Sequence, residues 1–404
     1  MNVLGLDEWQ WAPLTGPDAT AIVSAIRARH ARQFEVAPPD PLSGTPWRLR
    51  STGLVGFLPL GGDTGAALRI APKVPIASIL ALIERAYDLD NLRWHGGLDA
   101  ATTIEGLFEV LVSLLCHQIG ARIRQGLYRA YVEERDELQV ARGRISPRET
   151  IARSLRGSVG LVCDFEELTD DLDDNRLLLW TLDRVRRVAL GRADVRRSLR
   201  EQHRTLSAAL TLTPFTPAAC VGRFYHRLNA DYRPIHALCR AVLDACGAAN
   251  AAGPTETVPF TVDMPRLFER FVARWLAAAL PAWSIDAQHR ITLADDLTYP
   301  VDILIRDRAD GRAVAVIDTK YKDHDRPSPS DLQQVVFYAT ALGCADAWLL
   351  YPRPVSRRTI TVGPVRVHTL GIDLGDVDAW SRCSDALACD LRKFGMSARG
   401  VVAP

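Results

Sequence analysis

The 404-residue sequence lacks several features that would announce a class of protein at once. Its formal net charge is only +1, so no field over the whole molecule points to nucleic acid. Any contact with phosphate must therefore come from local patches. The chain has no Gly-x-x-x-x-Gly-Lys-Ser/Thr loop, because Gly61, Gly62 and Gly65 lie in a turn that such a lysine does not follow. This absence excludes a P-loop for a nucleoside triphosphate in this chain.

Paired cysteines and apolar runs of membrane length are also missing. The eight cysteines include no Cys-x-x-Cys pair, and several lie in apolar periodic segments, which is typical of reduced, buried thiols in a cytosol. His236, Cys239 and Cys246 have no evident fourth ligand, which argues against a zinc site. No signal peptide opens the chain, and the best apolar stretch, residues 271–280, is short and contains Arg274. We therefore expect a cytoplasmic protein with no membrane contact.

The composition is otherwise ordinary for a globular protein. Apolar residues make up 48% and charged residues 24%, and the length allows two or three domains. The patterns predict an α/β chain of the α+β multidomain kind. We expect a β-rich and helical region over residues 1–135, a mostly helical middle region over 136–254, and a mixed sheet flanked by helices over 255–404. The Ala/Gly/Pro-rich stretch 247–254 is the predicted linker.

The first two regions show alternating helix and strand patterns. We predict a helix over 19–32 with Asp18 as its N-cap, strands within 47–75, and helices over 76–86, 104–124 and 231–246. Tyr128 and Tyr131 fit core positions.

Two charged segments follow in the middle region. Residues 164–174 contain seven acids but lack the central Gly and terminal Glu of an EF-hand loop, which favours a solvated or capping segment. A helix begins near Asn175, and its continuation over 184–204 carries eight arginines. These arginines fit either a contact with a DNA backbone or a solvated surface, and both interpretations stay open.

The densest chemistry lies between residues 299 and 322. Two strand patterns, 299–305 and 313–322, flank a turn. Because strand side chains alternate, Asp318 and Lys320 project from one side, and Asp302 can meet Asp318 across the hairpin. Apolar residues precede the charges on both faces of the second strand, which indicates a central strand that ends at a cleft. Two carboxylates can hold Mg²⁺, which acidifies a bound water, and a lysine beside them can stabilise charge on phosphorus.

A helix over 264–276, with Asp263 as its cap, supplies another acid. Glu269 projects onto the apolar side of this helix, where a carboxylate is costly unless a metal, a water or Lys320 meets it. A glutamate that reaches solvent from the edge of the apolar arc is the alternative.

A later helix, capped by Ser330 and stopped by Gly343, brings Gln334 and Tyr338 onto one face. These two side chains could reach a phosphate or a metal-bound water, or they could be satisfied polar residues at the edge of the core.

Taken in order, Glu269, Pro300-Val-Asp302, Asp318-Thr-Lys320, Gln334 and Tyr338 resemble the PD-(D/E)XK nuclease core with the Gln-x-x-x-Tyr helix of one of its branches. The sequences 263–272 and 318–322 are more narrowly similar to McrC, the nuclease subunit of McrBC systems that restrict DNA with modified cytosine. The likeness extends more loosely to residues 55–56, 70–73, 126–131, 142–145 and 173–176.

This resemblance implies a magnesium-dependent endonuclease subunit of an antiviral restriction system directed at 5-methylcytosine. It implies metal binding by Asp302, Asp318 and Glu269, catalysis by Lys320, and support from Gln334 and Tyr338. It also implies that the N-terminal half docks on a McrB-like AAA+ GTPase ring and stimulates it, that the partner binds GTP and recognises the base, and that double-stranded DNA is cut. One departure is Val301, which separates the proline from the acid of the usual Pro-Asp motif.

Two other functions fit the same residues. The chain could be a non-catalytic adaptor that activates an AAA+ motor through its N-terminal half and carries a vestigial nuclease site, although the intact acids and lysine argue against this. It could also be a stand-alone PD-(D/E)XK repair nuclease, although the long N-terminal half without a DNA-reading motif favours a protein partner.

Overall fold

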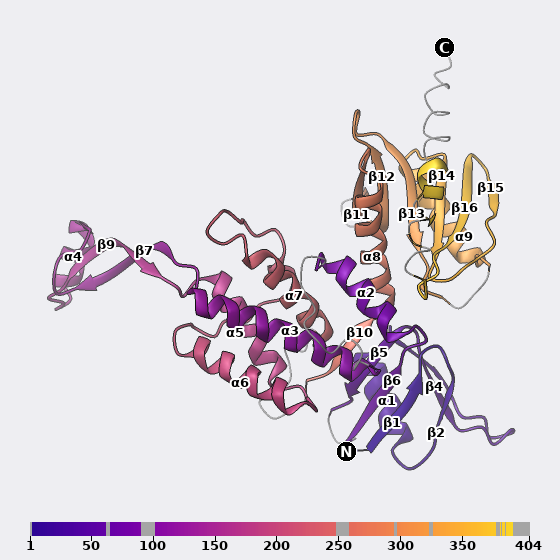
Figure 1. Ribbon diagram of the computed structural model, residues 1–404, viewed down its shortest axis with the longest axis horizontal. Coiled ribbons are helices and arrows are strands. Elements are labelled where there is room, and N and C mark those ends of the chain that lie inside the picture. Colours follow the sequence, from indigo (N-terminus) through magenta and orange to yellow (C-terminus); the bar gives the residue numbers. More distant parts are fainter. Residues whose placement is uncertain are drawn as a thin grey trace. The chain divides into compact units, whose positions relative to one another are not determined.

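The computed structural model has the multidomain α/β architecture predicted from the sequence (Figure 1). It describes residues 2–61, 65–89, 102–247, 258–294, 297–322, 326–376, 380, 382–383 and 385–390. The chain forms two compact units: the first unit contains residues 1–110 and 244–404, and the second contains 111–243. These limits differ from the expected ones at 135 and 254, because the N-terminal strands pack with segments that follow residue 258. The predicted linker lies almost wholly outside the described residues.

The N-terminal part of the first unit contains two small sheets. One has the strand order β1-β6-β5-β10, with β1 (Asn2–Asp7), β6 (Ala66–Ala71), β5 (Leu54–Pro59) and β10 (Phe260–Asp263). The other has the order β2-β4-β3, with β2 (Ala12–Leu14), β4 (Trp47–Ser51) and β3 (Phe34–Ala37). This part of the unit also contains helices α1 (Ala19–Arg29) and α2 (Ile76–Tyr87). Asp18 occupies the N-cap position of α1 as predicted, but its side chain makes no capping hydrogen bond.

Strand β10 joins the early and late parts of the chain within the first unit. It pairs antiparallel with β5, and Phe260 stacks between Phe57 and Phe108 at centroid distances of 6.0 and 5.1 Å. The close approach depends on Gly56, which has a φ of +114° and whose missing Cβ would lie 2.5 Å from the Phe260 carbonyl oxygen. An aromatic cluster and a backbone ladder therefore bind these segments together.

The C-terminal part of the first unit is a mixed six-stranded sheet in the order β11-β12-β13-β14-β16-β15. Its strands are β11 (Trp283–Ala294), β12 (Leu297–Asp307), β13 (Ala313–Thr319), β14 (Asp346–Tyr351), β16 (Val365–Gly371) and β15 (Thr359–Val362), with helices α8 (Met264–Ala279) and α9 (Pro329–Ala341) packed against it. Strand β13 lies inside the sheet, antiparallel to β12 and parallel to β14. The prediction of a central strand is therefore confirmed.

The second unit consists of helices and a long hairpin. Its helices are α3 (Ile104–Gln125, from residue 111 on), α5 (Asp173–Val185), α6 (Ala193–Ser207) and α7 (Tyr232–Ala245), with a 3-10 turn at Pro217–Cys220. Strands β7 (Ala130–Leu138) and β9 (Leu161–Thr169) extend away from these helices, and β8 (Arg144–Ile145) and α4 (Pro147–Ser154) complete what we call the arm, residues 130–169 (Figure 1).

Three expectations for this unit were wrong in part. The acidic stretch 164–174 does not form a single solvated segment, because its first half belongs to β9 and only its end opens α5. The helix expected to run on to residue 204 is broken between Val185 and Ala193. Tyr131 is no core residue, since 68% of it is exposed, whereas Tyr128 is half-buried.

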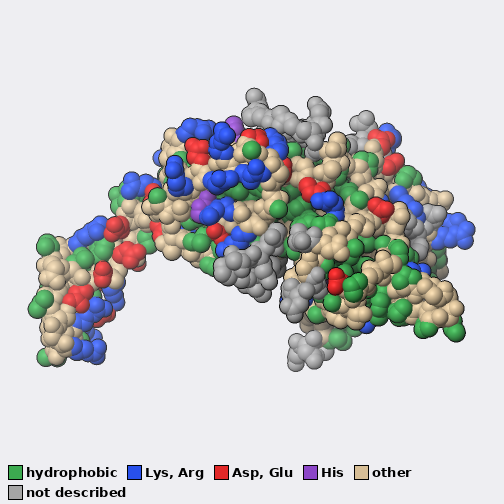
Figure 2. Space-filling view, turned by 90° about the horizontal axis from the view of Figure 1, so that it is seen from below, with side chains coloured by type: hydrophobic (Ala, Val, Ile, Leu, Met, Phe, Trp, Pro, Cys, Tyr) green, Lys and Arg blue, Asp and Glu red, His purple; other side chains and the backbone are tan. Residues whose placement is uncertain are grey.

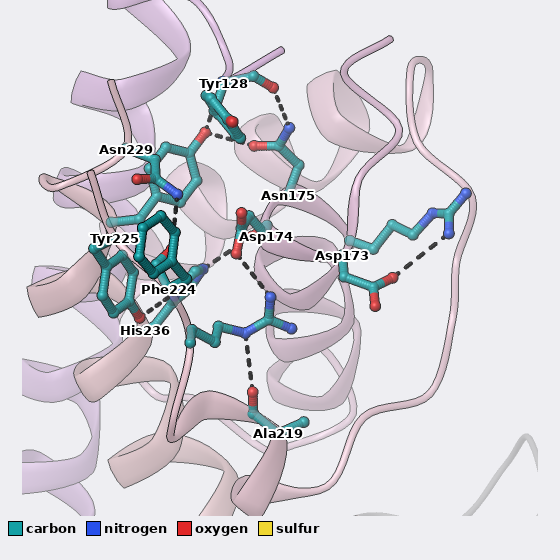
Figure 3. A network of polar contacts seen from close by, with 12 residues as sticks. Tyr128, Asp173, Asp174, Asn175, Ala219, Phe224, Tyr225, Asn229 and His236 are labelled. Carbon is teal, nitrogen blue, oxygen red and sulfur yellow. Dashed lines mark hydrogen bonds and ion pairs between the residues drawn. The ribbon is translucent and has the colours of Figure 1, made fainter. Parts of the chain in front are cut away.

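A buried polar network holds the root of the arm (Figure 3). The Asn175 side-chain amide donates to the carbonyl oxygens of Tyr128 and Asp170, which lie just outside the two ends of the hairpin. The Tyr232 hydroxyl donates to the Asn175 side-chain oxygen and accepts from the Tyr128 backbone N–H at 2.9 Å. Buried polar groups need partners, so this network fixes where the arm leaves the helices.

Among the described residues, one helix is long and apolar enough to span a membrane by length and composition, and it is α3. The stretch expected to come nearest to this was 271–280. Of the apolar window of α3, 61% is buried inside the protein.

Candidate active site

The hairpin of β12 and β13 brings the two predicted carboxylates together. The register pairs Ile303 with Ile317, which places Asp302 opposite Asp318. One Asp302 oxygen accepts hydrogen bonds from both the backbone N–H and the hydroxyl of Thr319, each at 2.8 Å. Asp302 of β12 is thereby hydrogen-bonded to Thr319 at the end of β13.

Lys320 connects this pair to helix α9. Its ammonium lies 2.6 Å from Asp318 Oδ2 and donates to Gln334 Oε1 at 2.8 Å. The Gln334 amide in turn donates to the Tyr338 hydroxyl at 2.9 Å. The structure therefore brings Gln334 and Tyr338 to the hairpin, where they orient the lysine.

Burial and like charge shape the acidity of the site. Asp318 is 1% exposed. Its burial, followed by the negative charge of Asp302, raises the pKa of Asp318 to about 7, against the effect of Lys320. Burial disfavours the charged form of Lys320, but the carboxylates of Asp318, Asp331 and Asp302 together outweigh this and raise the lysine pKa. An acid that titrates near neutral pH is thus paired with an amine that stays charged.

Glu269 reaches the same region from α8. This helix begins as predicted, because the Asp263 side chain accepts from the Arg266 backbone N–H at 3.0 Å. Glu269 is half-buried and bonds to the Gln288 side chain. Burial, followed by the charge of Asp302, raises the pKa of Glu269 to about 7. It is therefore close enough to Asp302 to feel its charge, and its direct partner is Gln288.

The donor set fits a hard divalent cation such as Mg²⁺. Two facing carboxylates suffice, because Mg²⁺ keeps several waters and takes few protein ligands. Asp318 Oδ2 is buried and has no aligned hydrogen-bond donor in the described part of the chain, although Lys320 lies near it. Among the described residues, no group of three or more His, Cys, Asp or Glu side chains is arranged to hold a metal ion. The fit to Mg²⁺ therefore rests on Asp302 and Asp318 alone.

His236, Cys239 and Cys246, considered from the sequence as a metal cluster, have the surroundings of ordinary core residues. His236 is buried, with Tyr225 at one ring nitrogen and the Asp174 carbonyl at the other. Cys239 and Cys246 are buried, as are four of the other six cysteines. The expectation of buried cysteines is thus confirmed for six of the eight.

One residue of the site had no predicted role. Asp331 is buried, lies 3.6 Å from the Lys320 ammonium and accepts from Lys322 at 2.8 Å. It also forms a capping box with Ser328, which is the N-cap of α9 in place of the expected Ser330. The spacing of a serine and an acid three residues later, with Pro329 between them, is a sequence signal that could have identified both.

Comparison with known proteins places the chain in a family. A family model described as "McrBC 5-methylcytosine restriction system component" matches residues 49–352, which is most of the chain. The chain belongs to this family. The McrC resemblance drawn from the sequence motifs is thereby confirmed, and the McrBC match includes Glu269, both aspartates, Lys320, Gln334 and Tyr338.

A solved structure of an McrBC assembly has a similar fold. A half-complex from a tetradecameric assembly of Thermococcus gammatolerans McrB AAA+ hexamers with bound McrC matches with a TM-score of 0.54 and 18% identity, over 96% of this chain and 100% of that chain. The cryo-EM structure of the Thermococcus gammatolerans McrBC complex matches with a TM-score of 0.44 and 18% identity, over 69% of this chain and 88% of that chain. A comparison with curated proteins gave no match.

Proposed function

We propose that this McrBC-family chain is the Mg²⁺-dependent DNA endonuclease subunit of a modified-DNA restriction system. The observation that carries the proposal is the meeting of Asp302, Asp318 and Lys320 at the end of a central strand, with Gln334 bonded to the lysine. This is the donor set that phosphodiester hydrolysis needs, and it supports an active site over a vestigial one.

Each side chain has a task in this mechanism. Asp302 and Asp318 would hold Mg²⁺, which supplies an acidified water and a positive charge for phosphate oxygens. Lys320 directs a fixed ammonium at the charge that develops on the phosphodiester, because Asp318 and Gln334 hold it in place. Glu269 can hold or release a proton near neutral pH, since its pKa lies at about 7.

The partner in this proposal is a McrB-like AAA+ GTPase ring, which binds the GTP and recognises 5-methylcytosine. The solved relative described as McrB AAA+ hexamers with bound McrC supports such a partner. The arm offers a surface for it: large apolar side chains are exposed near its end, and Figure 2 shows them among charged ones. They are Val140, Ile151, Leu155 and Val159. Apolar side chains gathered on a surface mark protein interaction sites.

The decisive experiment separates cleavage from activation of the partner. Asp318→Asn keeps the shape of the side chain but removes the metal-binding charge. We expect this variant to cut duplex DNA containing 5-methylcytosine at least about 100-fold more slowly, with Mg²⁺, GTP and a McrB-like GTPase present. Stimulation of GTP hydrolysis should stay at the wild-type level, because the arm is unchanged.

Asp310→Asn is the matched control, since Asp310 lies in the turn of the same hairpin and is exposed. It should cut like the wild type. Equal cleavage by Asp318→Asn and the wild type would refute the nuclease assignment. A wild-type chain that stimulates the GTPase but never cuts would establish the adaptor function instead.

A further inference from the structure

Cationic and aromatic side chains alternate in a continuous row on the N-terminal part of the first unit. The guanidinium carbons of Arg48 and Arg50 lie 5.4 and 4.8 Å from the centre of the Trp11 ring. Arg50 and the Lys73 ammonium lie 5.8 and 5.5 Å from the Trp9 ring, and Lys73 lies 4.7 Å from the Tyr321 ring. We call this set the cation–aromatic row: Arg48, Trp11, Arg50, Trp9, Lys73 and Tyr321.

The strands build this row from the sequence pattern. Arg48 and Arg50 are two apart on β4 and so project from one side. The antiparallel register of β2 and β4 pairs Ala12 with Leu49, which brings Trp11 beside Arg50. Trp9 has a positive φ of 64°, which is unusual for a bulky side chain and is held by its N–H bond to the Ser51 carbonyl. The backbone thus accepts strain to hold this ring in the row.

The row is accessible and positively charged. Arg48 and Lys73 are exposed, and Trp11 is 39% exposed. Arg50 forms an ion pair with Glu35, whereas Arg48 has no acidic partner among the described residues. In a chain whose net charge is only +1, the three cations of the row outnumber the two acids beside it, Glu35 and Glu8, and form a local basic patch.

The row ends at the candidate active site. Tyr321 follows Lys320 directly in the chain, is buried, and packs near Phe268 of α8. Its hydroxyl lies 3.4 Å from the Glu8 carboxylate, which also accepts from the Lys73 backbone N–H at 3.0 Å. Lys73 is therefore fixed against the residue next to the lysine of the site.

We propose that the cation–aromatic row binds the sugar–phosphate backbone of double-stranded DNA and guides it to the site; this rests on the proposed nuclease function. Stacking on an indole fixes the plane of a guanidinium and leaves its N–H edge free for phosphate oxygens. Because the guanidinium groups of Arg48 and Arg50 both lie over the Trp11 ring, this ring orients cations. The row binds charge and carries no sequence preference.

The test measures DNA binding without cleavage. The chain is titrated onto a fluorescent 30-base-pair duplex in EDTA, and the dissociation constant is measured at several salt concentrations. Arg48→Gln should weaken binding several-fold and reduce the slope of log K against log salt by about 0.9, the value of one phosphate contact. Trp11→Ala should also weaken binding although it removes no charge, and Trp11→Phe should restore most of the affinity because it keeps an aromatic face.

Arg358→Gln is the control, since it removes an exposed arginine beside the edge strand β15 and should leave binding unchanged. The proposal is overturned if Arg48→Gln and Trp11→Ala bind like the wild type, or if Arg358→Gln weakens binding as much as Arg48→Gln. Because the assay contains no metal, a failure of cleavage does not affect it. A row that binds DNA in a chain that never cuts would leave this inference standing and refute only the nuclease.

Discussion

Glu269→Gln provides a direct test of the electrostatics of the site through protein stability. The glutamine keeps the size of the side chain and can still bond to Gln288, but it cannot ionise. Burial and the charge of Asp302 raise the pKa of Glu269 from 4.5 to about 7. Between these two pH values the folded protein binds a proton that the unfolded chain has released, so the wild type loses stability as pH rises through this window. The glutamine variant has no such loss.

The magnitude follows from the two pKa values. Each pKa unit is worth about 1.4 kcal/mol, which sets an upper limit of about 3 kcal/mol for Glu269. Because the side chain is partly exposed, solvent screening reduces the expected effect to about 1–2 kcal/mol. We therefore expect the variant and the wild type to unfold with similar free energies near pH 4.5, and the variant to be more stable by about 1–2 kcal/mol above pH 7.

Urea denaturation in EDTA from pH 4.5 to 8 measures this difference. With Mg²⁺ added at pH 8, the wild type should gain more stability than the variant if Glu269 helps to hold the ion, because a bound cation favours the charged carboxylate. A difference between the two proteins that stays constant from pH 4.5 to 8 would show that Glu269 has no raised pKa, and the electrostatic description of the site would be wrong.

Three further predictions concern the framework of the site. Ser328→Ala should cost about 1 kcal/mol of unfolding free energy in urea and Ser330→Ala less than about 0.5; equal losses would contradict the assigned cap of α9. Gly56→Ala forces a Cβ to within 2.5 Å of the Phe260 carbonyl oxygen, so we expect a clearly lower Tm, and an unchanged Tm would show that β10 can move away. Tyr232→Phe takes the hydroxyl partner from three groups at the root of the arm, namely the Asn175 side-chain oxygen, the Tyr128 N–H and the Arg122 side chain, and should cost about 1–3 kcal/mol. Amide exchange there that stays as slow as in the wild type would argue against the network.

The sheet at the site could be predicted because its signals are local. The strand patterns predicted over 299–305 and 313–322 correspond to β12 and β13, and their alternation puts Asp302 and Asp318 where they face each other across the hairpin. The four-residue spacing of Gln334 and Tyr338 likewise placed them on one face of α9. These inferences need only the period of a strand or a helix.

Long-range and solvent-facing features could not be predicted in this way. Strand β7 alternates poorly, because charged residues face solvent along much of it, so its pattern predicts no buried face. The prediction that Tyr131 is a core residue was therefore wrong. No local pattern predicts that β10 pairs with β5, which lies about 200 residues earlier in the chain. This pairing depends on the packing of Phe260 against residues distant in the sequence.

The partnership of β10 with β5 also bears on how the protein can be dissected. A recombinant fragment cut at residue 255 to isolate the candidate active site would keep β10 but lose β5, the strand with which β10 pairs. It would also lose Phe57 and Phe108, whose rings stack with Phe260 of β10. The bare edge would be a template for self-association in the expression host. A usable minimal version must retain residues 1–110 together with 244 onward, joined by a short tether in place of the second unit.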